Sequence, residues 1–286
     1  MTVVLAVLFG VVIGVSLGAL GGGGSILTVP VLVYVIGETA RGATTASLVI
    51  VGITALVGAL GHARSGNVRW NAGIVFGVIG VGASYLGTDL NRHVNPNALL
   101  LAFAALMLIA AVAMLRRARP LTPTDTPAPP DAGHERGSRA AGGTVAALAA
   151  TPRLTARQVR VTPRTAAKVV AASLVVGFLT GFLGVGGGFI IVPALVIAMD
   201  FSMPVAVGTS LLVIALNSAA ALAARSGNET FHWAVIVPFT FAAIAGSLAG
   251  KTVADKVSGT TLSRAFAGLL IAVAIYVAVR SGIGLS

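Results

Sequence analysis

The chain has 286 residues, of which 56% are hydrophobic and only 9% are charged, and its formal net charge is +11. Soluble domains carry about 25% charged residues, so this composition predicts a polytopic membrane protein with little mass outside the bilayer. The basic residues lie mostly in loops and in a central linker, without an aromatic-interleaved stripe, which argues against nucleic-acid binding. There is no cysteine, which excludes disulfides, thiolate zinc sites and cysteine nucleophiles.

The first half contains five apolar segments bounded by polar, glycine or proline positions, at residues 3–20, 25–37, 43–61, 71–88 and 97–115. The first begins directly after Met1-Thr2 without a basic region, so we expect an uncleaved helix and not a signal peptide. Segment 25–37 would rise only about 20 Å against a hydrocarbon core of about 30 Å. It is therefore expected to be a half-helix, a re-entrant piece or a short span completed by its glycine end.

Residues 116–164 form a linker rich in proline, alanine, glycine and threonine. Such a segment cannot bury enough apolar surface to fold alone, so it is expected to be largely disordered. Basic residues outnumber acidic ones there, which places the linker in the cytoplasm by the positive-inside rule. The predicted domains are a first transmembrane repeat at 1–115, the linker at 116–164 and a second transmembrane repeat at 165–286.

The second half contains apolar segments at residues 167–183, 188–200, 205–224, 234–251 and 262–280, and it repeats the first half. The run Gly14–Pro30 recurs 163 positions later as Gly177–Pro193. The pentapeptide Ala63–Asn67 recurs verbatim as Ala224–Asn228, and a tryptophan follows each copy. Two homologous repeats of four or five membrane segments are therefore predicted, each with a glycine-broken short helix.

The relative orientation of the repeats depends on the short segments. If 25–37 and 188–200 cross the membrane, each half has five passes and the repeats are inverted about a pseudo-two-fold axis. If they do not cross, each half has four passes and the repeats are parallel, which leaves Lys251, Lys256 and Arg264 outside. The charge bias favours inversion. The predicted fold class is thus an all-α polytopic membrane protein with inverted-topology repeats.

The consecutive glycines are the main candidates for substrate binding. A glycine string before a helix exposes successive N–H groups at the positive end of the helix dipole, where no side chain blocks an anion. The candidates are Gly21, Gly22, Gly23, Gly24 and Ser25 in the first copy, and Gly184, Gly186, Gly187 and Gly188 in the second. The spaced glycines Gly14, Gly18, Gly177 and Gly181 are instead predicted to let helices pack closely.

Polar side chains in the following helices are further candidates: Thr45, Ser47, Thr209, Ser210 and Asn217. They could complete the coordination of an anion or simply bond to nearby carbonyls. Arg64 and Arg225 in the repeated loops could attract anions at a pore mouth, or could only set topology and a turn. Arg264 is expected to be the only charged residue inside the spans, so we expect electrogenic or weakly coupled anion export. No catalytic residue, metal site or cofactor is expected.

The pattern G-x-x-x-G-x-L-G-x-G-G-G-x-x-x-x-P, with Ser25 replacing its last glycine in the first copy, resembles the TauE/SafE family of sulfite and organosulfonate exporters. The resemblance covers nearly the whole chain except the linker. It implies a multi-pass cell-membrane permease for small sulfur-containing anions such as sulfite or sulfoacetate. A permease for a carboxylate, sulfate or thiosulfate and a non-transporting scaffold stay open as alternatives. The expected partners are a small anionic substrate and the lipid bilayer, with a homodimer as an open option.

Overall fold

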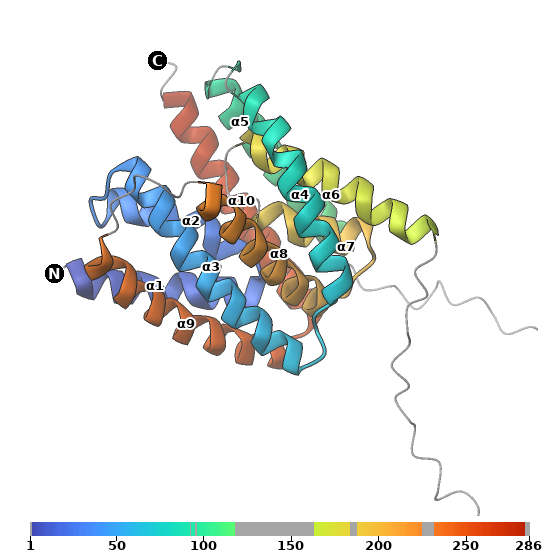
Figure 1. Cartoon of the computed structure of the whole chain (residues 1–286), viewed down its shortest axis with the longest axis horizontal. Helices are drawn as coiled ribbons and strands as arrows, with labels where there is room; N and C mark the ends of the chain where they lie inside the picture. The colour runs from blue at the N-terminus through green and yellow to red at the C-terminus, as the bar shows by residue number, and fades with distance from the viewer. Residues whose placement is uncertain are drawn as a thin grey trace, which may run out of the picture. The chain divides into compact units, whose positions relative to one another are not determined.

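The computed structural model describes residues 2–91, 93–94, 96–117, 163–183, 188–224 and 232–283. Most of the predicted linker lies outside this part of the chain, as do Gly184, Gly186, Gly187 and Arg225. The regular structure of the described residues consists of ten α-helices (Figure 1). They are α1 Thr2–Leu20, α2 Gly23–Tyr34, α3 Ala40–Arg64, α4 Trp70–Asn91, α5 Pro96–Arg117, α6 Pro163–Leu183, α7 Gly188–Ala198, α8 Met203–Ala224, α9 Trp233–Lys256 and α10 Gly259–Ile283. All ten belong to one compact unit formed by Met1–Arg119 and Pro163–Ser286.

The helices fit a membrane-spanning protein, as the composition predicts. Among the described residues, α1, α3, α4, α8, α9 and α10 are long and apolar enough to cross a bilayer. By contrast, α2 and α7 have 12 and 11 residues, which at about 1.5 Å per residue gives only about half of a bilayer core. The expected short helices after the glycine runs are therefore present.

Charged residues near the ends of candidate spans correct the expectation that Arg264 is alone within the spans: Arg64 ends that of α3, Asp89 lies next to the last residue of that of α4, and Lys256 ends that of α9. Lys251 and Asp255 lie in the last turns of α9, inside its candidate span, and their side chains pair at 2.5 Å. The two charges are four residues apart on one helix face, so each neutralises the other near the end of the span.

The break between α1 and α2 follows from glycine at position 21. Gly21 has φ of +75°, a left-handed conformation that other residues adopt only with strain, while its N–H still bonds the carbonyl of Leu17 at 2.8 Å. The chain then turns back along α1. A Cβ placed on Gly24 would lie 2.5 Å from the carbonyl oxygen of Ile13 and 2.9 Å from Cβ of Leu17. The start of α2 therefore fits against α1 only without side chains.

The two halves of the chain have matching helices. Adding 163 to the bounds of α1–α5 reproduces the bounds of α6–α10 within three residues. Residues separated by 163 are called counterparts below. Helix contacts match in the same way, since α1 packs along α9 and α6 packs along α4, while α3 contacts its own counterpart α8 (Figure 1). This pattern supports the predicted duplication.

The spaced glycines form the two long helix contacts. A Cβ on any of them would overlap a backbone carbonyl oxygen of the facing helix: that of Ala243 for Gly14, Ser247 for Gly18, Gly80 for Gly177 and Ser84 for Gly181. The last two contacts are the counterparts of the first two. Their predicted role in close helix packing is confirmed, because the partner backbone occupies the space that a side chain would need.

The directions of the helices can be read from the same contacts. Gly14 of α1 faces Ala243 of α9, and Gly18 faces Ser247. Residue numbers therefore increase in the same direction along the two helices, which run parallel. Along α3 and α8 the residue numbers run in opposite directions, because Gly52 faces Ser218 whereas Gly58 faces Leu211. Helix α3 is thus antiparallel to its counterpart α8, as an inverted repeat requires. This supports the orientation favoured by the charge bias.

Candidate functional site

The starts of the two short helices meet inside the helix bundle. A Cβ on Gly22 would overlap the carbonyl oxygen of Gly188, and a Cβ on Gly188 would lie 2.6 Å from Oγ of Ser25. Ser25 and Gly188 are counterparts, so the pseudo-two-fold axis passes between them. Glycine at 188 leaves the room that the Ser25 hydroxyl occupies, which explains why the two copies of the run differ here. Ser25 Oγ donates to the carbonyl of Gly22 at 2.8 Å.

Helix α8 holds the first break in place. Ser210 is fully buried, and its Oγ lies 2.9 Å from the carbonyl oxygen of Gly21 and 2.8 Å from that of Val207, so the hydroxyl donates to this pair of oxygens. Buried Thr209 accepts a bond from the backbone N–H of Arg69 at 3.1 Å. In this structure both hydroxyls thus bond backbone groups from other parts of the chain, and their role in substrate binding stays a prediction.

The end of α1 has a partner that the sequence interpretation did not single out. The last carbonyls of a helix have no partner within it. The carbonyl oxygen of Gly18 lies 3.0 Å from Nε2 of His62, a buried side chain near the end of α3, so Nε2–H donates to it. Nδ1 of His62 has no hydrogen-bond partner among the described residues. In the sequence, the one feature that could have pointed to His62 is its position directly after an otherwise apolar predicted span.

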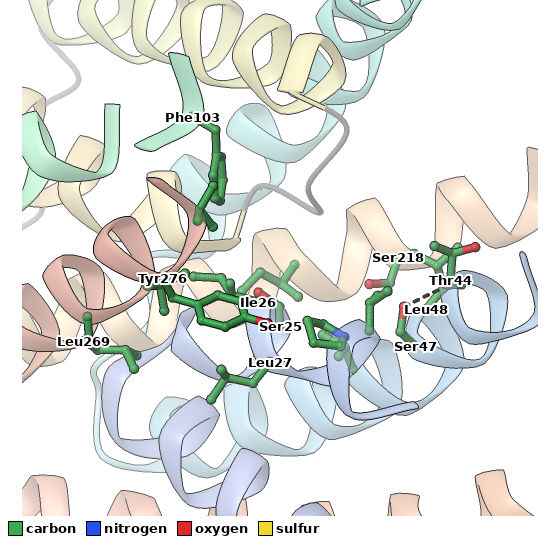
Figure 2. A pocket seen from close by; sticks show the side chains of 17 residues that line it. Ser25, Ile26, Leu27, Thr44, Ser47, Leu48, Phe103, Ser218, Leu269 and Tyr276 are labelled. Carbon is green, nitrogen blue, oxygen red and sulfur yellow. Dashed lines mark hydrogen bonds between the residues drawn. The ribbon is translucent and has the colours of Figure 1, made fainter. Parts of the chain in front are cut away.

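A cavity of about 680 Å³ lies beside α2. Its walls come from α2, α3, α5, α8 and α10, and they are mainly aliphatic (Figure 2). The lining includes five hydroxyl side chains, Ser25, Thr44, Ser47, Ser218 and Tyr276, and none of its residues is charged. Such a cavity offers apolar contact and neutral hydrogen bonding, without a fixed ionic partner.

The hydroxyls lie in two places in the view of Figure 2. Thr44, Ser47 and Ser218 gather at the end formed by α3 and α8, where Ser47 Oγ donates to the Thr44 carbonyl at 2.8 Å. At the other end, the ring of Tyr276 extends from α10 toward Ser25 on α2. Apolar side chains separate these two polar ends.

The cavity lining includes only some of the predicted site residues. Ser25 and Ser47 line it. The cavity lining does not include Gly21, Gly22, Gly23, Gly24, Gly188, Thr45, Thr209, Ser210 or Asn217, all of which are buried except the half-buried Asn217. Arg64 is exposed in the last turn of α3, away from the cavity lining. Of these glycines, Gly22 and Gly188 contact Ser25, and the binding role of all of them stays a prediction.

Several cavity residues escaped the sequence interpretation. Leu269, Val273 and Tyr276 come from α10, and Phe103 comes from α5, where its ring packs edge-on against Phe189 of α7 at a centroid distance of 5.0 Å. Nothing in the sequence distinguishes these residues from the lipid-facing side chains of the same helices. Only the packing of α10 against α5 and α2 brings them to the cavity.

The two halves differ in exposure although their sequences match. On α7, the residues from Gly188 to Pro193 are all buried, as are Leu195 and Val196. On α2, Leu27, Val29 and Pro30 are only partly buried, and all three line the cavity. The middle of α7 is thus covered by protein, whereas α2 faces the cavity, and a second cavity of about 440 Å³ lies at the end of α7, lined by Val196, Arg117 and Met203 among others.

Comparisons with known proteins agree with this membrane architecture. The sequence model of the family described as "Sulfite exporter TauE/SafE" matches residues 6–277. A "probable membrane transporter protein" of Xylella fastidiosa is 31% identical over 95% of this chain and 93% of its own length. A probable membrane transporter protein of Bacillus subtilis is 24% identical over 92% of each chain. Another, of Methanocaldococcus jannaschii, is 24% identical over 75% of this chain and 68% of its own length. No solved structure matches the chain.

Proposed function

Because the chain belongs to the TauE/SafE family of multi-pass membrane transporters, which are not enzymes, we propose that it exports small sulfur-containing oxyanions such as sulfite or an organosulfonate. The family description names sulfite export, and that is the first support for this substrate class. The observation that carries the proposal is the contact between the starts of α2 and α7 at Gly22 and Gly188, next to Ser25, which lines the cavity.

The chemistry of the α2 start suits an anion. The first N–H groups of a helix have no acceptor within it, and they lie at the positive end of the helix dipole. Helix α2 begins at Gly23, and its N-cap Gly22 contributes no side-chain hydrogen bond to these groups. An oxyanion reaching Ser25 would therefore meet backbone dipoles and a hydroxyl in place of a charged side chain.

The energy source follows from the charges of the described helices. No carboxylate lines the cavity, the Asp255 carboxylate within α9 is paired with Lys251, and Asp89 in the last turn of α4 is exposed. The membrane potential can drive export directly, since it contributes about 2.3 kcal/mol per charge at 100 mV, or about 4–5 kcal/mol for a divalent anion. We therefore propose electrogenic export. Inverted repeats that exchange their conformations would expose the site alternately to the two sides.

Flux through proteoliposomes with a clamped potential tests this function. Sulfite or sulfoacetate should leave vesicles faster when their interior is negative, and flux that ignores the potential would contradict electrogenic export. Carboxylate flux without sulfur-anion flux would overturn the substrate class. No flux of any anion would favour a scaffold.

Ser25→Ala and Ser47→Ala test the location of the site. Each variant removes one cavity hydroxyl while keeping the side chain small, so we expect anion affinity to fall about tenfold, the factor for a hydrogen bond to a charged group. Ser173→Ala is the matched control, because Ser173 is a fully buried serine on α6 that bonds only its own helix, at the Val169 carbonyl. Equal effects of all three changes would place the site elsewhere.

A further inference from the structure

A row of polar side chains lies between α3 and α9, apart from the cavity beside α2. Thr54 and His62 are two turns apart on α3, and Ser247, Lys251 and Asp255 follow one another at steps of four residues on α9, so each set lies on one helix face. We call these five residues the α3/α9 polar seam. None of them lines the cavity.

The two polar faces meet at glycines of α3. A Cβ on Gly58, one turn before His62, would lie 2.9 Å from Oγ of Ser247. A Cβ on Gly61 would lie 3.3 Å from Cδ of Lys251. The polar side chains of α9 therefore pack directly against the part of α3 that carries His62.

Three buried atoms of the seam have no hydrogen-bond partner among the described residues. They are Oγ1 of Thr54, Nδ1 of His62 and Oγ of Ser247. Thr54 and His62 are 1% exposed, and Ser247 is fully buried. Buried polar atoms are costly to leave unpaired, and in native proteins such groups usually bond ordered water. The seam thus offers a polar route within otherwise apolar helix contacts.

His62 is the group of the seam that can take up a proton. Its Nε2–H donates to the Gly18 carbonyl, so the neutral ring keeps an unshared lone pair on Nδ1. A proton added to Nδ1 converts the ring to an imidazolium and leaves the Nε2 bond in place. Histidine is also the side chain whose charge changes most readily near neutral pH.

The seam becomes more exposed toward the end of α9. The side chain of Asp255 is 39% exposed and that of Lys251 is 16% exposed, whereas His62 lies behind them at 1%. Water and protons can therefore reach Nδ1 from this end of the helix.

The charges that act on His62 come from α9. The carboxylate of Asp255 favours a proton on the ring, and the ammonium group of Lys251 opposes it. Helices α1 and α8, which also pack against His62, contain no charged residue, and Arg64 and Arg69 beside it in the chain are exposed. A metal cation in the seam would meet Lys251, and an anion would meet Asp255. A proton needs only the Nδ1 lone pair.

Resting on the transport proposed above, we infer that His62 is a proton-binding site reached through the α3/α9 polar seam, and that one proton enters as each anion leaves. The proton binds Nδ1 and leaves from the same atom, and no bond of the substrate changes. A leaving anion and an entering proton move charge in the same sense, so the exchange adds to electrogenic export. The Nε2 bond links the ring to Gly18, three residues before the break at Gly21.

Sulfoacetate flux in proteoliposomes tests the exchange, because its sulfonate and carboxylate are both ionised near neutral pH and bring no proton of their own. The potential is clamped at zero, and sulfoacetate starts at equal concentrations on both sides. With the exterior one pH unit more acid, exchange of one proton per anion should drive sulfoacetate outward to about a tenfold ratio. Labelled sulfoacetate that crosses without any net response to the pH gradient would overturn this inference alone. No movement of any anion would instead refute the proposed transport.

His62→Gln separates the proton site from the rest of the cycle. Glutamine keeps a donor for the Gly18 carbonyl but binds no proton. The variant should still exchange labelled for unlabelled sulfoacetate, and it should lose the tenfold response to the pH gradient. His93→Gln is the matched control and should keep both, because His93 is exposed just after α4 and bonds only the nearby Asp89 carbonyl. A full pH response in His62→Gln would overturn the assignment.

Nitrogen NMR of the purified protein with labelled histidine gives a readout that does not depend on transport. The signal of Nδ1 of His62, identified by comparison with His62→Gln, should change from the unprotonated to the protonated position as the folded protein is acidified. The Nε2 signal should stay protonated throughout. An Nδ1 that remains unprotonated until the protein unfolds would overturn the inference, even if His62→Gln no longer transports.

Discussion

Replacement of Gly18 by alanine should destabilise the contact between α1 and α9. The added Cβ would overlap the carbonyl oxygen of Ser247, whereas ordinary van der Waals contact begins at 3.4 Å. Backbone atoms cannot rotate away, so the helices must separate by about 1 Å or more. Overpacking of this kind costs about 1–3 kcal/mol. The loss exceeds the gain of up to about 1 kcal/mol from replacing glycine by alanine within a helix.

The cost extends beyond position 18 because the glycines form one stripe. Gly246 and Gly250 of α9 also face the α1 backbone, at the carbonyls of Val11 and Val15. Separation at one level weakens these neighbouring contacts, and between helices in a bilayer such dispersion contacts are a main source of attraction. The counterpart Gly181→Ala meets the Ser84 carbonyl and should show a comparable loss.

Gly82→Ala and Gly268→Ala are the matched controls. Both glycines lie within helices, and an added Cβ would meet nothing within 4 Å. They should therefore leave stability unchanged or raise it by up to about 1 kcal/mol. Denaturant unfolding of the purified protein in mixed micelles, followed by tryptophan fluorescence, measures the difference. If Gly18→Ala is as stable as Gly82→Ala, the close-packing argument is refuted.

Three further predictions concern the break between α1 and α2, and the same unfolding assay measures them. His62→Phe should lower the free energy of unfolding by about 1–3 kcal/mol, because it leaves the Gly18 carbonyl unpaired. His62→Gln should lower it less, and equal losses in the two variants would exclude the hydrogen bond. Ser210→Ala should cost about 1 kcal/mol because its hydroxyl bonds the Gly21 carbonyl, and a neutral result would show that water replaces it. Gly188→Ala should destabilise by overlap with Ser25, and Ser25→Gly should relieve the loss; additive effects would contradict the contact.

The amino-acid sequence by itself determined the membrane class, the duplication and the location of the first break, between α1 and α2. Apolar length decides whether a helix can cross a bilayer, and glycine readily adopts the positive φ that ends a helix, so both features are local. The spaced glycines could also be assigned to packing, because their period matches one helix face. Among the predicted site residues, Ser25 and Ser47 line the cavity, but nothing in the sequence separated them from the other candidates.

Only the tertiary structure decided which face of each helix meets another helix. Thr209 and Ser210 are predicted binding groups from sequence, and the structure adds that their hydroxyls bond the backbone of segments about 140 and 190 residues away in sequence. Tyr276 and Phe103 looked like ordinary apolar span residues, yet they line the cavity. In a protein whose helices are apolar on every side, hydropathy cannot distinguish lipid contact from protein contact. A helix face packs on another helix where the partner's backbone can come close, and in the sequence the glycines are the main sign of such faces.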